Sequence, residues 1–458
     1  MSSVAIVGGG ISGLSTAYYL AKANLGCTLI EARPRLGGVI HTERIRDCVV
    51  EAGPDSFLSA KPAAMELIRE LGLEHEVIGS NDHARVTFIR RHGRLVPLPD
   101  GVQMLVPTKI LPMAASPLLS WGTKFRMALE WFRRPSADGR DRSVAEFVEE
   151  HYGRETVDYL AEPLLAGIYG GDPAELSIGS VLGRFVELET KYGSLTRGVL
   201  AERPPASSRQ AVPLFRTLRN GLGSLVDAVS RAAAAQTTLV PGTVEALERE
   251  GAGFRLRVGG QWLSADYVVL ACEAHQAGRI VTPVDARAAA LLGSICYSSS
   301  MTVALGFERN AVKDQMRGFG FLIPKRERGR LLAGTWVGNK FPHRVPESLG
   351  VLRGFLGGAG NDAVLAENDD AVVAAVRQEL VEIAGVRAEP VFSRVFRWPA
   401  SMAQYTVGHA GRIRELEERL ESVPGLMLAG NGYHGIGIPD CIRMGKQAAQ
   451  RIARDRQT

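Results

Sequence analysis

The stretch Val4-Ala5-Ile6-Val7-Gly8-Gly9-Gly10-Ile11-Ser12-Gly13 decides the fold, because an apolar run leads into a glycine-rich turn and then into a helical pattern. In such a unit Gly8 permits the tight turn, and Gly10 lets the backbone approach a pyrophosphate. Gly13 lets the helix pack closely on the strand, while free N–H groups at the helix start point toward the phosphates. The stretch therefore predicts a dinucleotide-binding unit.

The residues that follow extend the same unit. Apolar and small residues recur at helical spacing at Leu14, Ala17, Tyr18 and Ala21. A second apolar strand, Cys27-Thr28-Leu29-Ile30, ends at Glu31, eighteen residues after Gly13. A carboxylate at this position accepts hydrogen bonds from both ribose hydroxyls and would repel a 2′-phosphate. The predicted ligand is therefore a dinucleotide without that phosphate.

Length and composition favour a multidomain globular protein. The 458 residues exceed what one hydrophobic core usually supports, and 45% hydrophobic with 22% charged residues is ordinary for a globular chain. The net charge of +5 is the difference between 54 basic and 49 acidic residues. This mild excess gives no case for nucleic acid as a partner.

The cysteines and the apolar runs indicate a cytoplasmic location. The five cysteines are scattered and form no C-x-x-C pair, which favours a reducing compartment and no metal site: Cys27, Cys48, Cys272, Cys296 and Cys441. No secretory signal is visible, and no apolar run reaches the ~18 residues of a membrane span. The nearest, 110–121, is interrupted by Pro112 and Pro117.

The predicted fold class is α/β, with a Rossmann-like cofactor domain assembled from three chain segments. These segments are 1–80, 212–290 and 391–458, because strand and helix patterns of the same kind recur in all three. Residues 81–211 are predicted to form a helical region, and 291–390 the sheet of an inserted α+β substrate domain. Helices are expected at 123–134, 143–152, 369–384 and 440–454, and a loop at 204–213.

Longer motifs resemble one enzyme family. Residues 31–38, Glu-Ala-Arg-Pro-Arg-Leu-Gly-Gly, resemble the second motif of the FAD-dependent amine oxidase superfamily. Four further segments resemble, in order, signatures of the oxygen-dependent protoporphyrinogen/coproporphyrinogen oxidase family of haem biosynthesis: Glu51 to Phe57, Glu162 to Asp172, Gln404 to His409 and Gly430 to Cys441. The resemblance covers essentially the whole chain.

The resemblance implies bound FAD and names the residues that hold it. Backbone runs beside the flavin at 53–56 and beneath it near 431–438, where small residues let main chain approach a ring face. The helix beginning near Asp440 would aim its positive end at the flavin and stabilise the anionic reduced form. The implied cofactor residues are Gly8, Gly9, Gly10, Ile11, Ser12, Gly13, Glu31, Ala32, Arg33, Gly38, Val39, Gly53, Pro54, Asp55, Ser56, Val244, Asn431, Ile436, Gly437 and Ile438.

The implied chemistry is repeated hydride removal from a porphyrinogen, with dioxygen reoxidising the flavin to give hydrogen peroxide. No side-chain nucleophile and no metal is required, since the cofactor carries the hard step. By the same resemblance Gly167 would lie over the flavin, and Leu165, Leu322 and Ile323 would line the substrate cavity. Plain core packing is an equal alternative for Leu322 and Ile323.

The residues around the expected propionate-binding cation depart from the family's pattern. Many family members carry an arginine where this chain has Thr87, and Ala403 replaces a frequent proline. Guanidinium groups pair with carboxylates bidentately, so the neighbours Arg85, Arg90, Arg91 and Arg94 are candidates, and we take Arg91 as the predicted contact. A solvated charged face is the alternative.

Several alternatives stay open at this point. The substrate is coproporphyrinogen III or protoporphyrinogen IX, with residues 99–108 resembling the coproporphyrinogen-type members. Another amine oxidase or desaturase, and a non-catalytic escort-type binding protein, are the other functions considered. Residues 103–121, ending in Trp121, are compatible with reversible peripheral membrane contact. The sequence leaves the oligomeric state open.

Overall fold

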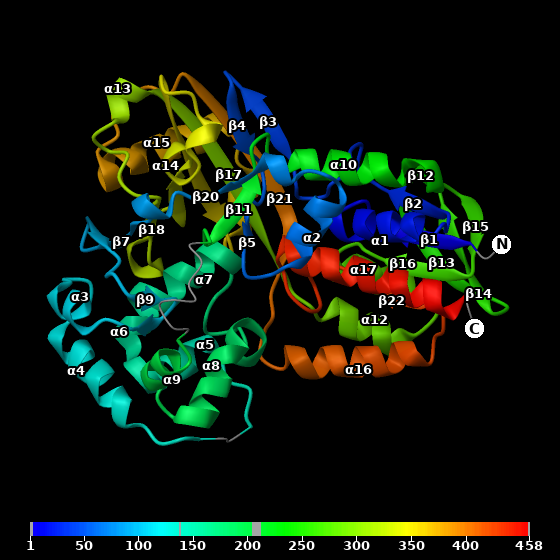
Figure 1. Cartoon of the computed structure of the whole chain (residues 1–458), viewed down its shortest axis with the longest axis horizontal. Helices are drawn as coiled ribbons and strands as arrows, with labels where there is room; N and C mark the ends of the chain where they lie inside the picture. Colours follow the sequence, from blue (N-terminus) through cyan, green and yellow to red (C-terminus); the bar gives the residue numbers. More distant parts are fainter. Residues whose placement is uncertain (1–2, 137–138, 204–211, 457–458) are drawn as a thin grey trace.

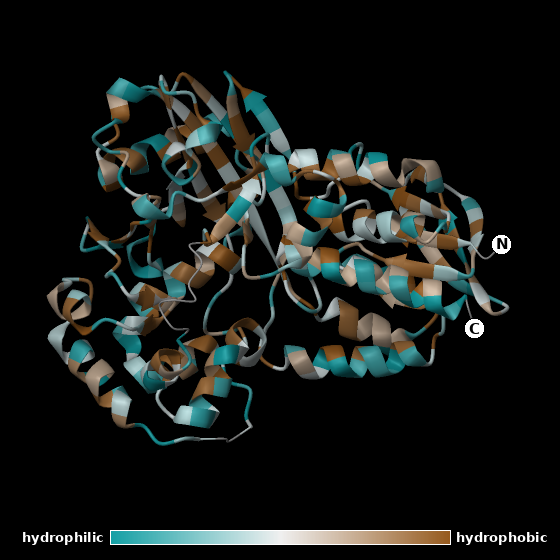
Figure 2. Ribbon diagram, in the orientation of Figure 1, coloured by the Kyte–Doolittle hydropathy of each residue, from teal (hydrophilic) through white to brown (hydrophobic). Residues whose placement is uncertain are grey.

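The computed structural model describes residues 3–136, 139–203 and 212–456. Three regions are visible: a sheet with helices that holds both termini, a second sheet beside it, and a group of helices below that sheet (Figure 1). Apolar residues concentrate in the strands and on the inner helix faces, whereas α16 (His409–Glu421) is largely hydrophilic (Figure 2). The predicted loop at 204–213 lies mostly outside the described residues.

A five-stranded parallel sheet forms the first region. Its strands, in spatial order, are β12 (Thr237–Pro241), β2 (Cys27–Glu31), β1 (Val4–Val7), β16 (Tyr267–Leu270) and β22 (Leu426–Leu428). Every residue of β1 is buried, as expected for a central parallel strand covered on both faces. The strands come from three distant stretches of chain, and this parallel sheet confirms the predicted Rossmann-like fold class.

Helices pack on this sheet at close range. The helices of this region are α1 (Ile11–Lys22), α2 (Ala63–Glu70), α10 (Gly223–Ala233), α11 (Ala274–Val281), α12 (Ala286–Gly293), α16 and α17 (Ile438–Asp455). A Cβ on Gly445 of α17 would lie 2.4 Å from the Ser12 carbonyl oxygen of α1, so the two helices meet backbone to backbone. The helix predicted at 440–454 corresponds to α17, which starts two residues earlier.

Small antiparallel sheets accompany the two large sheets. A meander comprises β13 (Val244–Glu250), β14 (Gly253–Val258) and β15 (Gln261–Ala265). The other small sheets are β3 (Thr42–Ile45) with β4 (Cys48–Glu51), β5 (Phe57–Leu58) with β11 (Phe215–Leu218) and β6 (Val77–Gly79), and β9 (Val102–Gln103) with β10 (Val106–Pro107).

The second large sheet has seven strands. Their order is β21 (Phe392–Ala403), β17 (Tyr297–Glu308), β20 (Leu349–Gly357), β19 (Ala333–Trp336), β18 (Gly320–Leu322), β7 (Thr87–Arg91) and β8 (Arg94–Pro97). Helix α15 (Asp369–Ala384), predicted with these bounds, packs on it, and α13 (Arg309–Val312) and α14 (Val337–Lys340) are short. Three strands of this sheet come from outside 291–390. Strand β21 pairs with β17 along most of its length, and β7, which carries β8 beside it, pairs with β18.

The helical region has a core of its own. It contains α3 (Ile110–Ala115), α4 (Trp121–Leu129), η3 (Glu130–Phe132), α5 (Val144–Tyr152), α6 (Arg154–Thr156), η4 (Val157–Ala161), α7 (Glu162–Tyr169), α8 (Ile178–Tyr192) and α9 (Leu195–Ala201). The helix predicted at 123–134 is wrong at its end, since α4 stops at Leu129. Glu130 there turns inward and accepts hydrogen bonds from Ser194 and the Leu195 N–H.

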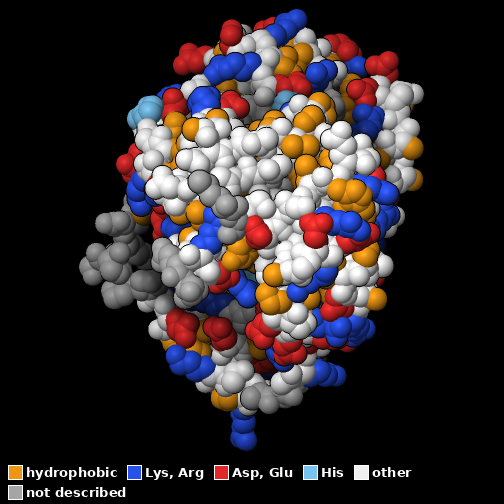
Figure 3. All heavy atoms as spheres, turned by 90° about the vertical axis from the view of Figure 1, so that its right-hand side faces the viewer, with side chains coloured by type: hydrophobic (Ala, Val, Ile, Leu, Met, Phe, Trp, Pro, Cys, Tyr) orange, Lys and Arg blue, Asp and Glu red, His pale blue; other side chains and the backbone are white. Residues whose placement is uncertain are grey.

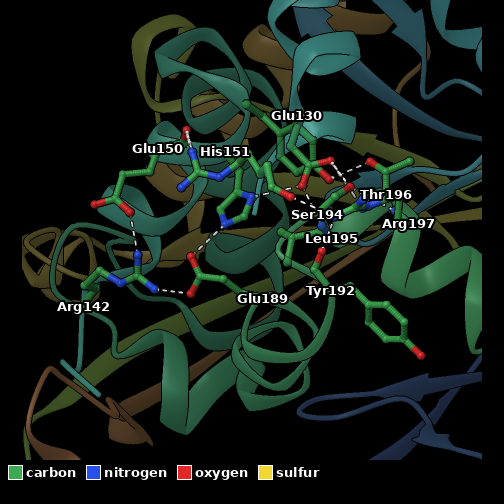
Figure 4. A network of polar contacts seen from close by, with 12 residues as sticks. Glu130, Arg142, Glu150, His151, Glu189, Tyr192, Ser194, Leu195, Thr196 and Arg197 are labelled. Atoms are coloured by element: carbon green, nitrogen blue, oxygen red, sulfur yellow. Dashed lines mark hydrogen bonds and ion pairs between the residues drawn. The ribbon is translucent and has the colours of Figure 1, made fainter. Parts of the chain in front are cut away.

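A buried ionic network fixes this turn (Figure 4). Nδ1 of His151 lies 3.1 Å from Oε1 of Glu130, and Nε2 lies 3.1 Å from Oε1 of Glu189. Arg142 pairs with Glu189 from the other side and with Glu150 at 2.5 Å. The network therefore ties η3 to α5, α8 and α9, and the Phe147 ring lies against both His151 and Arg142.

Candidate functional site

The predicted phosphate-binding turn lies between β1 and α1. Gly8 has φ of +106°, and a Cβ on Gly13 would lie 2.0 Å from the Gly8 carbonyl oxygen. Gly10, the N-cap of α1, supplies no side-chain cap, so the first N–H groups of this helix remain available to a ligand. Ile11 and Ser12 are buried in the first turn. A glycine turn at a helix start fits a pyrophosphate, because Gly8, Gly9 and Gly10 have no side chains to keep the phosphates away from the N–H groups of the helix.

Glu31 stands beside this turn at the end of β2. Its carboxylate accepts hydrogen bonds from the Gly9 N–H at 2.5 Å and the Arg33 N–H at 2.7 Å. Both bonds fix the carboxylate at the carboxyl edge of the sheet, where ligands bind in open α/β sheets. The Arg33 guanidinium lies 3.6 Å from Glu273, and Ala32 is exposed. The ribose contact of Glu31 stays a prediction.

The second motif returns to the glycine turn. The Gly37 N–H donates to the Gly9 carbonyl at 2.8 Å, and Gly38 lies directly beside Gly10. Arg35 holds this return by donating to the carbonyls of Leu36, Gly38 and Ile40. The two glycine motifs therefore form one continuous backbone surface.

The segment 53–56 continues from that surface. A Cβ on Gly53 would lie 2.0 Å from the Val39 carbonyl oxygen, so only glycine fits there. The Asp55 carboxylate pairs with Lys340 at 2.9 Å, and Arg353 lies 3.6 Å away. Burial alone would raise the pKa of Asp55, but Lys340 and Arg353 outweigh it and hold the pKa well below its usual range. The Asp55 side chain is thus committed internally, leaving the backbone of Gly53, Pro54 and Ser56 for a cofactor.

The last predicted cofactor segment is the loop between β22 and α17. Gly430 and Gly435 have φ of +151° and +115°, and Asn431 donates from Nδ2 to the Ser401 carbonyl at 2.9 Å. Residues 436–438 lead into α17, whose first turn is capped by Asp440 accepting from the Gly437 N–H at 3.3 Å. Val244 lies buried at the start of β13.

The predicted substrate residues do not all meet. A Cβ on Gly167 of α7 would lie 3.3 Å from Leu322 of β18, so these two face each other across the helical region and the seven-stranded sheet. Leu165 and Ile323 are 0% exposed and belong to separate apolar cores. The cavity lining stays a prediction for both residues, and core packing stays the alternative for Ile323.

Arg91 is also engaged elsewhere. Its guanidinium pairs with Glu155 at 2.8 Å, donates to the Pro117 carbonyl and lies over the Tyr159 ring. The propionate contact of Arg91 stays a prediction, and binding a propionate would first require breaking the bridge to Glu155. The sequence analysis did not single out Arg328 among the basic residues near the site. Its guanidinium pairs with Glu162 of α7 at 2.6 Å, beside β18. The basic run 325–330 was the available signal.

An arginine-lined pocket of about 530 Å³ was also missed. Arg394 and Arg397 of β21 meet Arg33 and Arg35 there, with Glu43 as the carboxylate among the lining residues. No sequence signal joins them, since the two pairs come from distant parts of the chain. The face that holds the chain termini differs from this pocket, because positive and negative side chains are interspersed there (Figure 3).

Two residues bear on the amine oxidase alternative. Trp398 is buried and donates from Nε1 to the Ala52 carbonyl at 2.8 Å, so its ring edge is already used. Cys441 lies within α17, and burial raises the pKa of its thiol to about 11. Neither arrangement favours an aromatic cage or a covalent flavin link. Within the described ranges, no three His, Cys, Asp or Glu side chains gather as a metal site.

Comparisons with known proteins agree with this geometry. The family model for flavin containing amine oxidoreductases matches residues 11–453. The chain is 36% identical to a coproporphyrinogen III oxidase of Bacillus subtilis (strain 168), over 97% of this chain and 96% of that protein. It is 28% identical to the chloroplastic protoporphyrinogen oxidase 1 of Arabidopsis thaliana, over 98% and 87%.

Solved structures extend the comparison. A crystal structure of a protoporphyrinogen oxidase candidate from Exiguobacterium sp. 255-15 superposes with a TM-score of 0.89 at 32% identity, covering 99% of both chains. Cyclohexylamine oxidase from Brevibacterium oxydans has a TM-score of 0.71 at 19% identity, which reflects the fold alone.

Proposed function

The chain belongs to the flavin containing amine oxidoreductase family, and from this premise we propose that it is an FAD-dependent porphyrinogen oxidase of haem biosynthesis. The proposal is supported by a cradle of glycine turns that suits a dinucleotide, in a chain that is similar over its full length to coproporphyrinogen III oxidases. The same cradle speaks against an escort-type protein that has lost the cofactor.

The protein's part in the reaction is binding, orientation and exclusion of water. The glycine turn at 8–13 would hold the pyrophosphate, Glu31 the ribose, and the backbone at 53–56 and 431–438 the flavin end. Bound FAD supplies the hydride-accepting ring. Gly167 and Leu322 would bring the substrate against that ring, since both lie where the helical region meets the seven-stranded sheet.

We propose coproporphyrinogen III as the preferred substrate. Three relatives named coproporphyrinogen III oxidase are 31–36% identical to the chain, compared with 28% for the plant protoporphyrinogen oxidase. The decisive experiment supplies both porphyrinogens to the purified holoenzyme and follows porphyrin fluorescence. A higher kcat/KM for protoporphyrinogen IX would overturn the preference, and turnover of neither would overturn the proposed function.

We further propose that dioxygen is the electron acceptor. Hydrogen peroxide should then appear in step with dioxygen consumption during turnover, measured with an oxygen electrode and a peroxidase-coupled assay. Turnover that continues without dioxygen when a quinone is supplied, and that produces no peroxide in air, would contradict this acceptor.

Reversible contact with an anionic membrane surface is the last part of the proposal. An exposed apolar surface supports it, formed by Ile110, Leu111, Trp121, Phe125 and Phe132, which are 86%, 81%, 74%, 66% and 76% exposed. Lys109, Lys124, Arg126 and Arg133 flank these residues, as in interfacial helices that bind anionic lipids. Among the described helices, none has the length and apolar character needed to span a bilayer.

Vesicle binding tests this contact. The holoprotein should co-sediment with vesicles that contain phosphatidylglycerol, and Trp121→Ser should weaken the binding severalfold. Trp262→Ser is the matched control, because Trp262 is 42% exposed on β15, outside the apolar surface. Equal binding of both variants, or no binding of wild type, would refute the membrane contact.

A further inference from the structure

The loop 430–437 is held from outside by the side chain of Tyr405. The Tyr405 hydroxyl donates to the Asn431 carbonyl at 2.8 Å and accepts the Gly435 N–H at 2.8 Å. One oxygen atom thus bridges two points of the loop that are four residues apart. Tyr405 is 3% exposed, so water does not compete readily for either bond.

His409, the first residue of α16, completes the contact. Its ring stacks on Tyr405 with centroids 3.9 Å apart and planes 11° apart, and its Nε2 lies 3.1 Å from the Tyr433 carbonyl oxygen. Burial lowers the pKa of His409 to about 4, so the ring is neutral at physiological pH. Nε2 must then carry the hydrogen to donate to the carbonyl.

The loop depends on these contacts because it lies outside helix and strand. Between β22 and α17, Gly430 and Gly435 adopt positive φ. Glycine has more backbone freedom than other residues, so the loop keeps one shape only where other contacts hold it. Three loop groups, the Asn431 and Tyr433 carbonyls and the Gly435 N–H, are bound by the Tyr405 and His409 pair. The pair therefore fixes the loop at its beginning, middle and end.

We propose that Tyr405 and His409 are positioning residues that hold the backbone of 431–435 in the shape that receives the flavin. The stacked pair thereby sets both the affinity for FAD and the reduction potential of the bound flavin. This inference rests on the proposed function, since it requires that FAD lies against this loop.

Tyr405→Phe tests the proposal, because it keeps the ring and removes both hydrogen bonds. We expect the dissociation constant of FAD, titrated into the apoprotein by flavin fluorescence, to rise about tenfold or more. The midpoint potential, measured by dye equilibration, should shift relative to wild type. Tyr152→Phe is the matched control, since Tyr152 is equally buried and bonds Thr196 at 3.0 Å in the helical region.

A second pair of variants keeps the proposal falsifiable if Tyr405→Phe does not fold. His409→Ala should weaken FAD binding, and His409→Gln should restore part of it, because the amide can donate to the Tyr433 carbonyl. Unchanged affinity and potential in Tyr405→Phe, or no difference between His409→Gln and His409→Ala, would overturn the positioning role. Wild-type protein that binds no FAD would instead overturn the proposed function.

Discussion

Replacing Arg344 with methionine should destabilise the protein strongly. Arg344 and Glu51 have side chains that are each 1% exposed, and they pair at 2.8 Å beneath the segment that leads into Gly53. Removing the guanidinium leaves the Glu51 carboxylate buried, with only the Thr42 hydroxyl and the Leu222 N–H as donors. Breaking one side of a buried pair costs about 3–5 kcal/mol, so we expect that loss in the free energy of unfolding at pH 7.

The pH dependence of this loss carries a definite sign. Burial raises the pKa of Glu51, and Arg344 opposes that rise, so the Arg344→Met variant should have a still higher pKa at Glu51. A carboxyl whose pKa is raised by folding stabilises the fold at low pH and loses that contribution as pH rises. The destabilisation should therefore be smaller at pH 5 than at pH 7.

Urea unfolding of the single and double variants measures the pair. Glu51→Gln with Arg344→Met removes both charges, and the double variant should lose at least about 2 kcal/mol less than the two single losses combined. Arg287→Met is the control, since Arg287 pairs with Glu415 at 2.6 Å but is 55% exposed, and its loss should stay below about 1 kcal/mol. Additive single losses, or equal losses for Arg344→Met and Arg287→Met, would refute the reasoning.

Three further changes test other parts of the molecule. Gly13→Ala should give protein purified without flavin absorbance, because the new Cβ would lie 2.0 Å from a backbone oxygen, whereas Gly122→Ala has open space and should leave flavin content unchanged. Glu31→Gln should raise the dissociation constant of FAD about tenfold by fluorescence titration, since one charged acceptor becomes neutral; an unchanged value would contradict its role. Burial alone would raise the pKa of Glu189, but His151 and Arg142 outweigh it and lower the pKa. The stability of the fold should therefore fall as pH drops below about 4.3. Acid unfolding, followed by circular dichroism, should be less steep in Glu189→Gln than in wild type.

The sequence predicted local features well. The glycine turn at 8–13, Glu31 and the helix 369–384 each follow from a pattern contained within a few residues, and the structure has the turn, the carboxylate and the helix at those places. Longer motifs predicted the family, because the order and spacing of several loops carry more information than any one periodicity.

Contacts between distant residues were not predictable in the same way. The strand β21 joins the seven-stranded sheet because β17 accepts it as an edge partner, which no pattern within 392–403 reveals. Arg91 of β7 is one of four arginines predicted as candidates for the propionates, with a solvated charged face as the alternative, and no local pattern indicates its pairing with Glu155 of α6. Helix α4 ends at Leu129, where Glu130 turns inward to bond His151. His151 lies too far along the sequence for a helical pattern around residue 130 to indicate this contact.

The parallel sheet has a consequence for how the protein is made. Strand β1 leaves the ribosome well before its neighbour β16, which begins at residue 267, and before the edge strand β22, which begins at residue 426. Synthesis at roughly 5–20 residues per second then leaves β1 paired with β2 alone, and without β16 on its other side, for many seconds. One edge of this apolar strand stays unpaired during the interval, and the site for the prosthetic group can close only after residues 431–438 have been made.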